Sequence, residues 1–328
     1  MGNTLAEAIE ILKQLPEKYV EKALEAIREV KSEHEKEEKH TIPPCPNCKS
    51  EKIVKNGKKC RKQAFLCRTC GKSFVETSNT TLFNSHSDEA VWKQVIRDTV
   101  NGVPINKTAS ELALHHETVF NMRHKILFAI EQQEIKNPTK LTGVCEADET
   151  YILESYKGKK SPGGFWRKPR KHGAVATKAG LSNEYICVCT GIERDGNAVA
   201  VAVNRATASK EDINLVFGGR VDQSTLILSD GAKGYNVLNG KCEVQAVNKD
   251  SGGFYNINTI NSYHSFIKDR NRKARGFATK YLNRYNSLFS MVFRKTDNIT
   301  DKIFELLCDM NNRYHTNNDS QTRSLLEV

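Results

Sequence analysis

The sequence lacks any long hydrophobic run. No stretch approaches the roughly 18 consecutive apolar residues of a membrane-spanning helix, and no secretion signal or nuclear-localisation segment is recognisable. These absences argue against a membrane partner and predict a cytoplasmic, nucleoid-associated protein of prokaryotic type. Apolar residues still make up 38% of the chain and charged residues 27%, so a sizeable core can form, with room for two or three domains.

Acidic residues are too few to balance the basic ones. The chain has 39 Asp and Glu against 50 Lys and Arg, which gives a net charge of +11. Such a surplus favours a polyanionic partner, above all nucleic acid, although ordinary solubilising charge can give the same number. Of the ten cysteines, four form two CxxC pairs, a spacing typical of metal binding in a reducing compartment and not of disulfides.

The two CxxC pairs predict one structural Zn²⁺ site. Each pair bends the backbone so that both thiolates face the same ion, and four thiolates make a closed tetrahedral site. Asn56-Gly57, between the pairs, is a hairpin-turn signal. We therefore expect a zinc ribbon over residues 41–78, rich in basic side chains, with Cys60 outside the site. The predicted ligands are Cys45, Cys48, Cys67 and Cys70.

Helical periodicity precedes and follows the ribbon. Residues 1–40 have the apolar spacing of a helical N-terminal arm, and residues 85–135 contain three helical segments with a short turn before the last. Three such helices match a helix-turn-helix, whose third helix would enter the major groove, although any small helical bundle looks similar. The residues expected to contact DNA from that helix are Thr118, Asn121, Arg123 and Lys125.

The segment Gly143–Leu153 has the length and composition of a buried strand but contains three acidic residues. Residues two apart in a strand share a face, so Glu146 and Asp148 point one way and Glu149 points the other. Carboxylates inside an apolar strand are costly to bury without a compensating cation. The alternatives are an edge strand with hydrated carboxylates and a site for a hard metal ion.

The chain beyond this strand alternates strands and helices. Two apolar runs, 184–192 and 198–203, should complete an antiparallel meander with it. A later buried strand ends at Asp230, and another strand covers 243–247. A long helix then runs from about residue 258 to 293, with a break near Gly276. Asn261, His264 and Lys268 share one stripe of that helix, which matters only if the stripe faces Asp148 and Asp230.

Between the first two of these strands lies a glycine-rich basic loop, residues 156–173, with two aromatic side chains. Such a loop can neutralise phosphates and stack on bases, or it can be a plain solvated loop. Its predicted DNA-binding residues are Lys159, Lys160, Arg167, Lys168, Arg170 and Lys171.

Several motifs together resemble those of insertion-sequence transposases that join a zinc ribbon to an integrase-type catalytic domain, the ISXO-like group. They are Glu146-Ala-Asp148-Glu149-Thr-Tyr, Leu228-Ser-Asp230-Gly and Asn258-Thr-Ile-Asn261-Ser-Tyr-His-Ser-Phe-Ile-Lys268. The strand and helix order, with Asp on the first and fourth strands, is the layout of an RNase H-like fold. The predicted fold class is therefore α/β (α+β) multidomain: a zinc ribbon and a helix-turn-helix, then an RNase H-like mixed five-stranded sheet with flanking helices.

The resemblance implies an RNase H-like catalytic domain over 141–295, followed by a C-terminal helix and tail over 296–328. It implies that Asp148, Asp230 and Asn261 hold two Mg²⁺ ions, with Mn²⁺ as an alternative, and that Lys268 contacts a phosphate. The implied reaction is 3′-end cleavage and strand transfer by two-metal phosphoryl transfer. The implied partners are double-stranded DNA, as transposon ends and as target, and further copies of the chain in a homodimer or higher oligomer.

One position departs from the usual pattern of such enzymes, because Asn261 stands where most carry Glu. A subset of the resembling family has this Asp-Asp-Asn-Lys form, but Asn offers one neutral oxygen where Glu offers two charged ones. Alternatives therefore remain: an inactive relic, a non-catalytic DNA-binding regulator, or a nuclease of the same fold that cuts without joining. The ribbon could also bind a protein instead of DNA.

Overall fold

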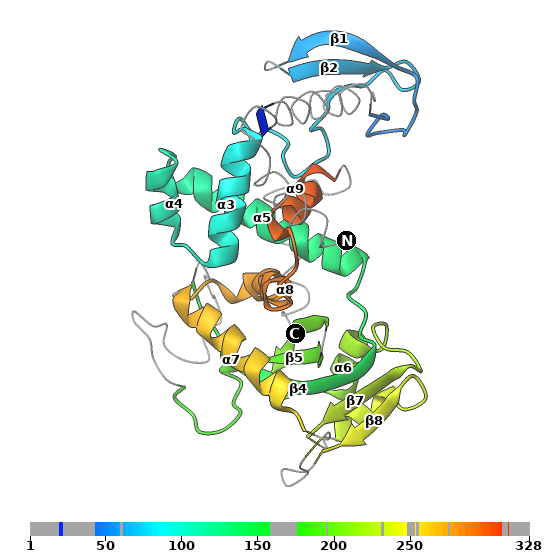
Figure 1. Cartoon of the computed structure of the whole chain (residues 1–328), viewed down its shortest axis with the longest axis vertical. Coiled ribbons are helices and arrows are strands. Elements are labelled where there is room, and N and C mark those ends of the chain that lie inside the picture. The colour runs from blue at the N-terminus through cyan, green and yellow to red at the C-terminus, as the bar shows by residue number, and fades with distance from the viewer. Residues whose placement is uncertain are drawn as a thin grey trace. The chain divides into compact units, whose positions relative to one another are not determined.

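The computed structural model describes residues 43–59, 62–157, 176–194, 196–230, 233–247, 256–274 and 276–309, with residues 20, 21, 253 and 314 (Figure 1). The chain divides into two compact units, Met1–Glu76 and Thr77–Val328. Apart from residues 20 and 21, which are helical, the predicted N-terminal arm lies outside the described residues, and so does Cys60. The finer domain boundaries given above stay predictions.

The first unit contains a three-stranded antiparallel sheet made of β1 (Ile53–Lys59), β2 (Lys62–Cys67) and β3 (Ser73–Val75). The hairpin turn predicted at Asn56-Gly57 is wrong. These residues lie inside β1, where the register with β2 shifts between Lys55 and Lys58. Gly57 has a φ of 66°, which a residue without a Cβ adopts at little cost, so Asn-Gly makes a bulge here instead of a turn.

Three consecutive helices open the second unit. Asp88 caps the first by accepting a hydrogen bond from Val91 N, and Gly102 ends it with a φ of 73°. The second helix ends at Glu111, and Ala113, two residues later, takes a φ of 50° that a continuing helix does not allow. The third is 21 residues long and ends at Lys136. The helices are α3 (Glu89–Asn101), α4 (Ile105–Glu111) and α5 (His116–Lys136).

The second unit is built on a five-stranded mixed sheet with the order β6-β5-β4-β7-β8. β4, β5 and β6 form the predicted antiparallel meander, while β7 and β8 continue the sheet in parallel with β4. This order and these directions are those of an RNase H-like fold, which confirms the predicted class. The strands are β4 (Gly143–Leu153), β5 (Tyr185–Glu193), β6 (Ala198–Arg205), β7 (Thr225–Ser229) and β8 (Glu243–Ala246).

Helices cover both faces of this sheet. The long helix predicted near the C-terminus is broken, as expected, at Gly276, whose φ is 73°. Its two halves pack on one face of the sheet, α5 packs against the second of these halves and the last helix packs against α5, while α6 packs on the other face of the sheet. These helices are α6 (Lys210–Phe217), α7 (Asn258–Lys273), α8 (Leu282–Phe293) and α9 (Ile299–Cys308), with short 3₁₀ turns η1 (Lys233–Leu238) and η2 (Thr279–Tyr281).

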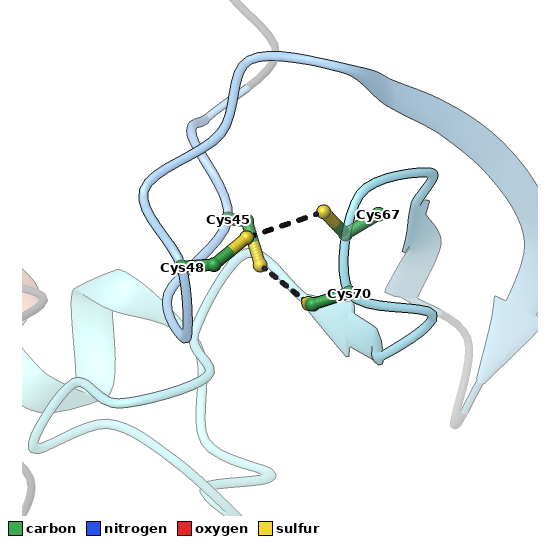
Figure 2. Close-up of side chains that lie close together, drawn as sticks. All are labelled: Cys45, Cys48, Cys67 and Cys70. Carbon is green, nitrogen blue, oxygen red and sulfur yellow. Dashed lines mark hydrogen bonds between the residues drawn. The ribbon is translucent and has the colours of Figure 1, made fainter.

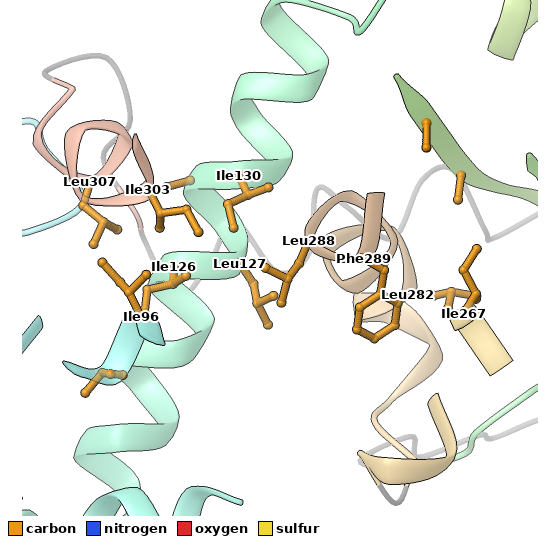
Figure 3. Close-up of a cluster of buried hydrophobic side chains, with 14 of the residues drawn as sticks. Ile96, Ile126, Leu127, Ile130, Ile267, Leu282, Leu288, Phe289, Ile303 and Leu307 are labelled. Atoms are coloured by element: carbon orange, nitrogen blue, oxygen red, sulfur yellow. The ribbon is translucent and has the colours of Figure 1, made fainter. Parts of the chain in front are cut away.

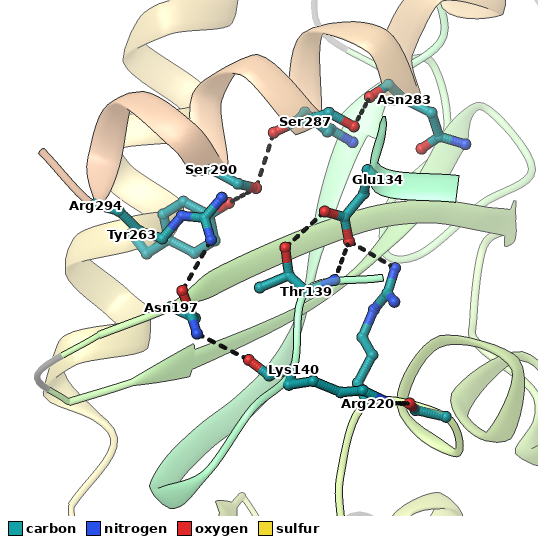
Figure 4. A network of polar contacts seen from close by, with 12 residues as sticks. Glu134, Thr139, Lys140, Asn197, Arg220, Tyr263, Asn283, Ser287, Ser290 and Arg294 are labelled. Atoms are coloured by element: carbon teal, nitrogen blue, oxygen red, sulfur yellow. Dashed lines mark hydrogen bonds and ion pairs between the residues drawn. The ribbon is translucent and has the colours of Figure 1, made fainter. Parts of the chain in front are cut away.

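The larger hydrophobic core joins the helices α3, α5, α7, α8 and α9 to one face of the strands β5 and β6. Figure 3 shows how Leu127 of α5 lies against Leu288 of α8, and how Ile126 faces Ile303 of α9. Polar contacts tie the same layers together (Figure 4): Tyr263 Oη of α7 is 2.6 Å from Ser290 Oγ of α8, and Arg294 donates to Asn197 Oδ1 at 2.9 Å. Because α7 is fixed both to α8 and to the sheet, its polar stripe has a defined position.

Among the residues that the structure describes, none of the helices combines the length and the apolar character that crossing a membrane requires.

Candidate active site and metal centre

The four predicted zinc ligands meet in the first unit (Figure 2). Their sulfur atoms all lie within 4.8 Å of one another, with Cys45 Sγ 3.6 Å from Cys70 Sγ and Cys48 Sγ 3.5 Å from Cys67 Sγ. Four thiolates bound to Zn²⁺ at about 2.3 Å would be about 3.8 Å apart in a tetrahedron. The backbone N–H groups of Cys70 and then Thr69 lower the pKa of the Cys67 thiol to about 6. The cluster therefore suits one Zn²⁺ ion.

We expect Cys45→Ser to lower the zinc content from one ion per chain to well below one, because a site with three thiolates is no longer closed. The ribbon core around Phe65 and Phe74 should loosen with it. Metal analysis of the purified protein measures the first effect. Cys308→Ser is the control, since that thiol is exposed on α9. Equal zinc in both variants would contradict the assignment.

The second cluster forms where β4 and β7 run side by side in parallel. The register pairs Glu146 with Leu228, so two residues further along both strands Asp148 and Asp230 come next to each other. Asp148 is half-buried, and Asp230 follows directly after the carboxyl end of β7 and is exposed. The two aspartates singled out in the sequence are therefore brought together at one edge of the parallel strands.

The electrostatics of Asp148 reflect this neighbourhood. Burial raises the pKa of Asp148 to about 6, the negative charge of Asp230 adds to the rise, and Lys268 opposes it. Asp148 Oδ1 accepts the backbone N–H of Glu149 at 2.8 Å. Two carboxylates in a partly dehydrated position repel each other, and a bound cation stabilises such a pair strongly.

The polar stripe of α7 brings His264 and Lys268 close to Asp148. His264 is buried, and its Nδ1 lies 3.9 Å from Asp148 Oδ2. Burial, and then the charge of Lys268, lower the pKa of His264 to about 4, so the ring is neutral near pH 7. Asn261 and Lys268 are exposed on the same stripe. Asn261, His264 and Lys268 thus share a face of α7, as expected, and His264 and Lys268 of that face lie near Asp148.

Glu146 shares a face with Asp148 but has a different role. Its side chain is fully buried, and Oε1 accepts from Arg194 Nε at 3.0 Å. Its Oε2 accepts the backbone N–H of Ile260 at 2.9 Å, in the first turn of α7. The residue before that helix, Ile257, has no side-chain acceptor. Glu146, which belongs to β4, therefore supplies the acceptor that a capping side chain would normally provide. It fixes the start of α7 relative to Asp148.

Glu149 lies on the opposite face of β4, as the alternation predicted. Its Oε1 accepts a hydrogen bond from Tyr235 Oη at 2.9 Å, and burial raises its pKa. The contact ties β4 to the 3₁₀ turn η1 (Lys233–Leu238), which follows Asp230 by three residues. Glu149 therefore braces the segment after Asp230 and does not line the Asp148 cluster.

The donor set around Asp148 fits a divalent cation. It offers carboxylate oxygens from Asp148 and Asp230 and a buried imidazole nitrogen from His264, and Asn261 lies one turn before His264 on α7 with an exposed amide. Carboxylate and amide oxygens are ligands that Mg²⁺ and Mn²⁺ prefer. Binding such an ion would also remove the repulsion between the two carboxylates. The assignment of Asp148, Asp230 and Asn261 as ligands remains a prediction.

The four residues predicted to contact DNA from α5 are placed differently from one another. Thr118 and Asn121 are exposed. Arg123 donates to the backbone oxygen of Val103 at 2.8 Å, and Lys125 donates to that of Phe83 at 3.1 Å. Burial lowers the pKa of both basic groups. Arg123 and Lys125 therefore hold neighbouring backbone in place, and DNA contact stays a prediction for all four residues.

The predicted DNA-binding residues of the basic loop, Lys159, Lys160, Arg167, Lys168, Arg170 and Lys171, lie outside the described residues. Two residues of the Asp148 site were missed from the sequence. Thr190, the cross-strand neighbour of Asp148, interrupts an apolar run with a hydroxyl, and this could have been noticed. Arg194, which holds Glu146, follows β5 with no distinguishing local pattern.

Comparison with known proteins finds a similar family model and a similar relative. Residues 140–296 match the model of the ISXO2-like transposase domain. A Halobacterium salinarum chain, named as an uncharacterized protein in transposable element ISH50, is 22% identical over 261 residues, covering 76% of this chain and 86% of the relative. These matches confirm the resemblance predicted from the sequence motifs.

Solved structures of Mos1 transposase are more distant. A pre-cleavage Mos1 transpososome matches with a TM-score of 0.25 and 11% identity, over 64% of this chain and 75% of that one. A Mos1 paired-end complex with the left transposon end matches with a TM-score of 0.26 and 12% identity, over the same shares of the two chains. TM-scores this low do not establish a shared fold.

Proposed function

We propose, on the premise that residues 140–296 form an ISXO2-like transposase domain, that this chain binds the ends of an insertion sequence and catalyses their cleavage and joining to target DNA. The observation that supports the proposal is that Asp148 and Asp230 lie side by side at the end of the parallel strands, with His264 of α7 3.9 Å from Asp148. The reaction class is metal-assisted phosphoryl transfer at a phosphodiester.

The roles of the residues follow from their positions. Asp148, central on β4, and Asp230 would hold divalent metal, with Asn261 contributing its amide oxygen from α7. Divalent ions bound there would lower the pKa of an attacking water or 3′-hydroxyl and stabilise the leaving oxygen. Lys268 is exposed two turns beyond Asn261 and would hold a phosphate close to the scissile one by charge. Glu146 and Arg194 keep α7 in register with β4.

Double-stranded DNA is the proposed partner for the rest of the chain. The net charge of +11 supports a polyanion, and the exposed Thr118 and Asn121 of α5 would contact the transposon end as part of a helix-turn-helix. The zinc ribbon and the basic loop would add phosphate contacts. Two ends must be paired before they are joined, so we propose a homodimer or higher oligomer on DNA.

The test is a joining assay with the zinc-loaded full chain. Labelled duplexes carrying the sequences that flank the reading frame are mixed with plasmid and Mg²⁺ or Mn²⁺. We expect cleaved 3′ ends and labelled plasmid, both abolished by chelator. Cleavage without joined product would instead identify a nuclease. Specific binding of the flanking sequence without either product would identify a non-catalytic regulator. This is the alternative that the neutral side chain of Asn261 supports.

A further inference from the structure

We propose that His264 is a ligand of the divalent ion held by Asp148, binding it through Nδ1, and that Thr190 presets the tautomer this requires. The inference rests on the proposed function, since it assigns a further ligand to the same site. It is carried by a chain of hydrogen bonds between β4, β5 and α7 that leaves only one arrangement of protons.

The arrangement begins at the Thr190 hydroxyl. Its Oγ1 lies 2.6 Å from the backbone oxygen of Asp148 and 2.6 Å from His264 Nε2. A carbonyl oxygen only accepts, so the single hydroxyl proton is donated to Asp148. Thr190 must therefore accept from His264, and Nε2 carries the proton.

The other ring nitrogen is then the one with a lone pair. His264 Nδ1 lies 3.9 Å from Asp148 Oδ2, which is too far for a hydrogen bond, so this nitrogen donates no proton to that oxygen. In a neutral imidazole protonated at Nε2, Nδ1 is unprotonated and can bind metal. The same pattern, a ligating histidine whose second nitrogen donates to a neighbouring oxygen, is the usual way proteins orient such a ligand.

The position of Nδ1 also suits this role. It lies 3.9 Å from Asp148 Oδ2, while Oδ1 of the same carboxylate is occupied by the N–H of Glu149. Neighbouring ligands of an octahedral ion at about 2.1 Å are about 3 Å apart. Asp side chains rotate readily about χ2, so a closing movement of about 1 Å brings both atoms into range of one ion.

A histidine ligand would change the metal preference of the site. Two carboxylates and the neutral Asn261 give a hard oxygen set, and an imidazole nitrogen moves the preference from Mg²⁺ toward Mn²⁺ and later transition metals. We therefore expect Mn²⁺ to bind more tightly than Mg²⁺, with His264 responsible for much of the difference. The weaker donor at Asn261 is thereby partly offset.

The experiment uses Mn²⁺ as the probe, with the zinc-loaded full chain and without DNA. Pulsed electron paramagnetic resonance should detect coupling of the Mn²⁺ spin to a directly bound ¹⁴N nucleus. His264→Gln places its amide near the Nε2 position, so it keeps the contact with Thr190 and the fold but removes the ligand. We expect it to lose the nitrogen coupling and to bind Mn²⁺ about 10–100-fold more weakly.

Two further variants distinguish an error in the histidine ligand from an error in the metal site itself. His264→Asn places an oxygen near the Nδ1 position, and we expect it to lose the nitrogen coupling yet bind Mg²⁺ at least as tightly as His264→Gln. Asp148→Asn should abolish Mn²⁺ binding at this site altogether. If His264→Gln keeps the wild-type Mn²⁺ affinity and spectrum while Asp148→Asn loses the ion, the histidine ligand is wrong and the site stands. If Asp148→Asn binds Mn²⁺ normally, the proposed metal site itself is wrong.

Discussion

Asp148→Asn should abolish cleavage and strand transfer while leaving DNA binding intact. The substitution keeps the shape of the side chain and its hydrogen bond from Glu149 N, but it removes the negative charge beside Asp230. Without that charge a divalent ion binds poorly, and the activation of the attacking oxygen is lost with it. We expect the joining rate to fall by roughly 10³-fold or more, which corresponds to a loss of about 4 kcal/mol in transition-state stabilisation.

The measurement compares joined product and DNA affinity in the same preparations. Asp230→Asn should behave like Asp148→Asn, because both carboxylates hold the ion. Asp269→Asn is the matched control, since Asp269 lies one residue beyond Lys268 and its ion pairs among the described residues are with Arg272 and Lys273 of its own helix. It should join DNA at close to the wild-type rate. Full strand transfer by either of the first two variants would overturn the catalytic assignment.

Those parts of the site that depend on local periodicity could be predicted from the sequence. The alternation along β4 placed Glu146 and Asp148 on one face and Glu149 on the other, and the described contacts agree. Helical spacing placed Asn261, His264 and Lys268 on one stripe. The order of strands, with an aspartate on the first and fourth, was enough to predict the sheet that brings those aspartates together.

Contacts between distant segments could not be predicted in this way. Arg194 lies 48 positions from Glu146, and nothing in either neighbourhood indicates the other. The bulge at Asn56-Gly57 was mistaken for a turn because both use the same positive φ. Arg123 and Lys125 border the buried face of α5, and whether such long side chains reach outward to DNA or inward to a carbonyl depends on loops whose paths local patterns do not specify.

Glu146→Ala should destabilise the second unit by about 3–5 kcal/mol, because it leaves Arg194 without its buried partner. It also leaves the Ile260 N–H without an acceptor at the start of α7. We expect faster hydrogen exchange at that amide and a drop in DNA joining even at temperatures where the unit remains folded, since Asn261 and Lys268 lie on the loosened helix. Urea unfolding, exchange rates and the joining assay measure the three effects.

Two conservative variants separate positioning of α7 from general loss of stability. In Glu146→Gln the amide oxygen can still accept from Ile260 N, but its NH₂ group opposes Arg194 Nε. We therefore expect a loss of about 1–3 kcal/mol, with the Ile260 amide still protected and joining largely retained. Glu149→Gln, on the other face of the same strand, keeps an acceptor for Tyr235 Oη and should leave exchange in α7 unchanged. If Glu146→Ala and Glu146→Gln expose the Ile260 amide equally, the carboxylate does not cap α7, and the drop in joining must come from lost stability alone.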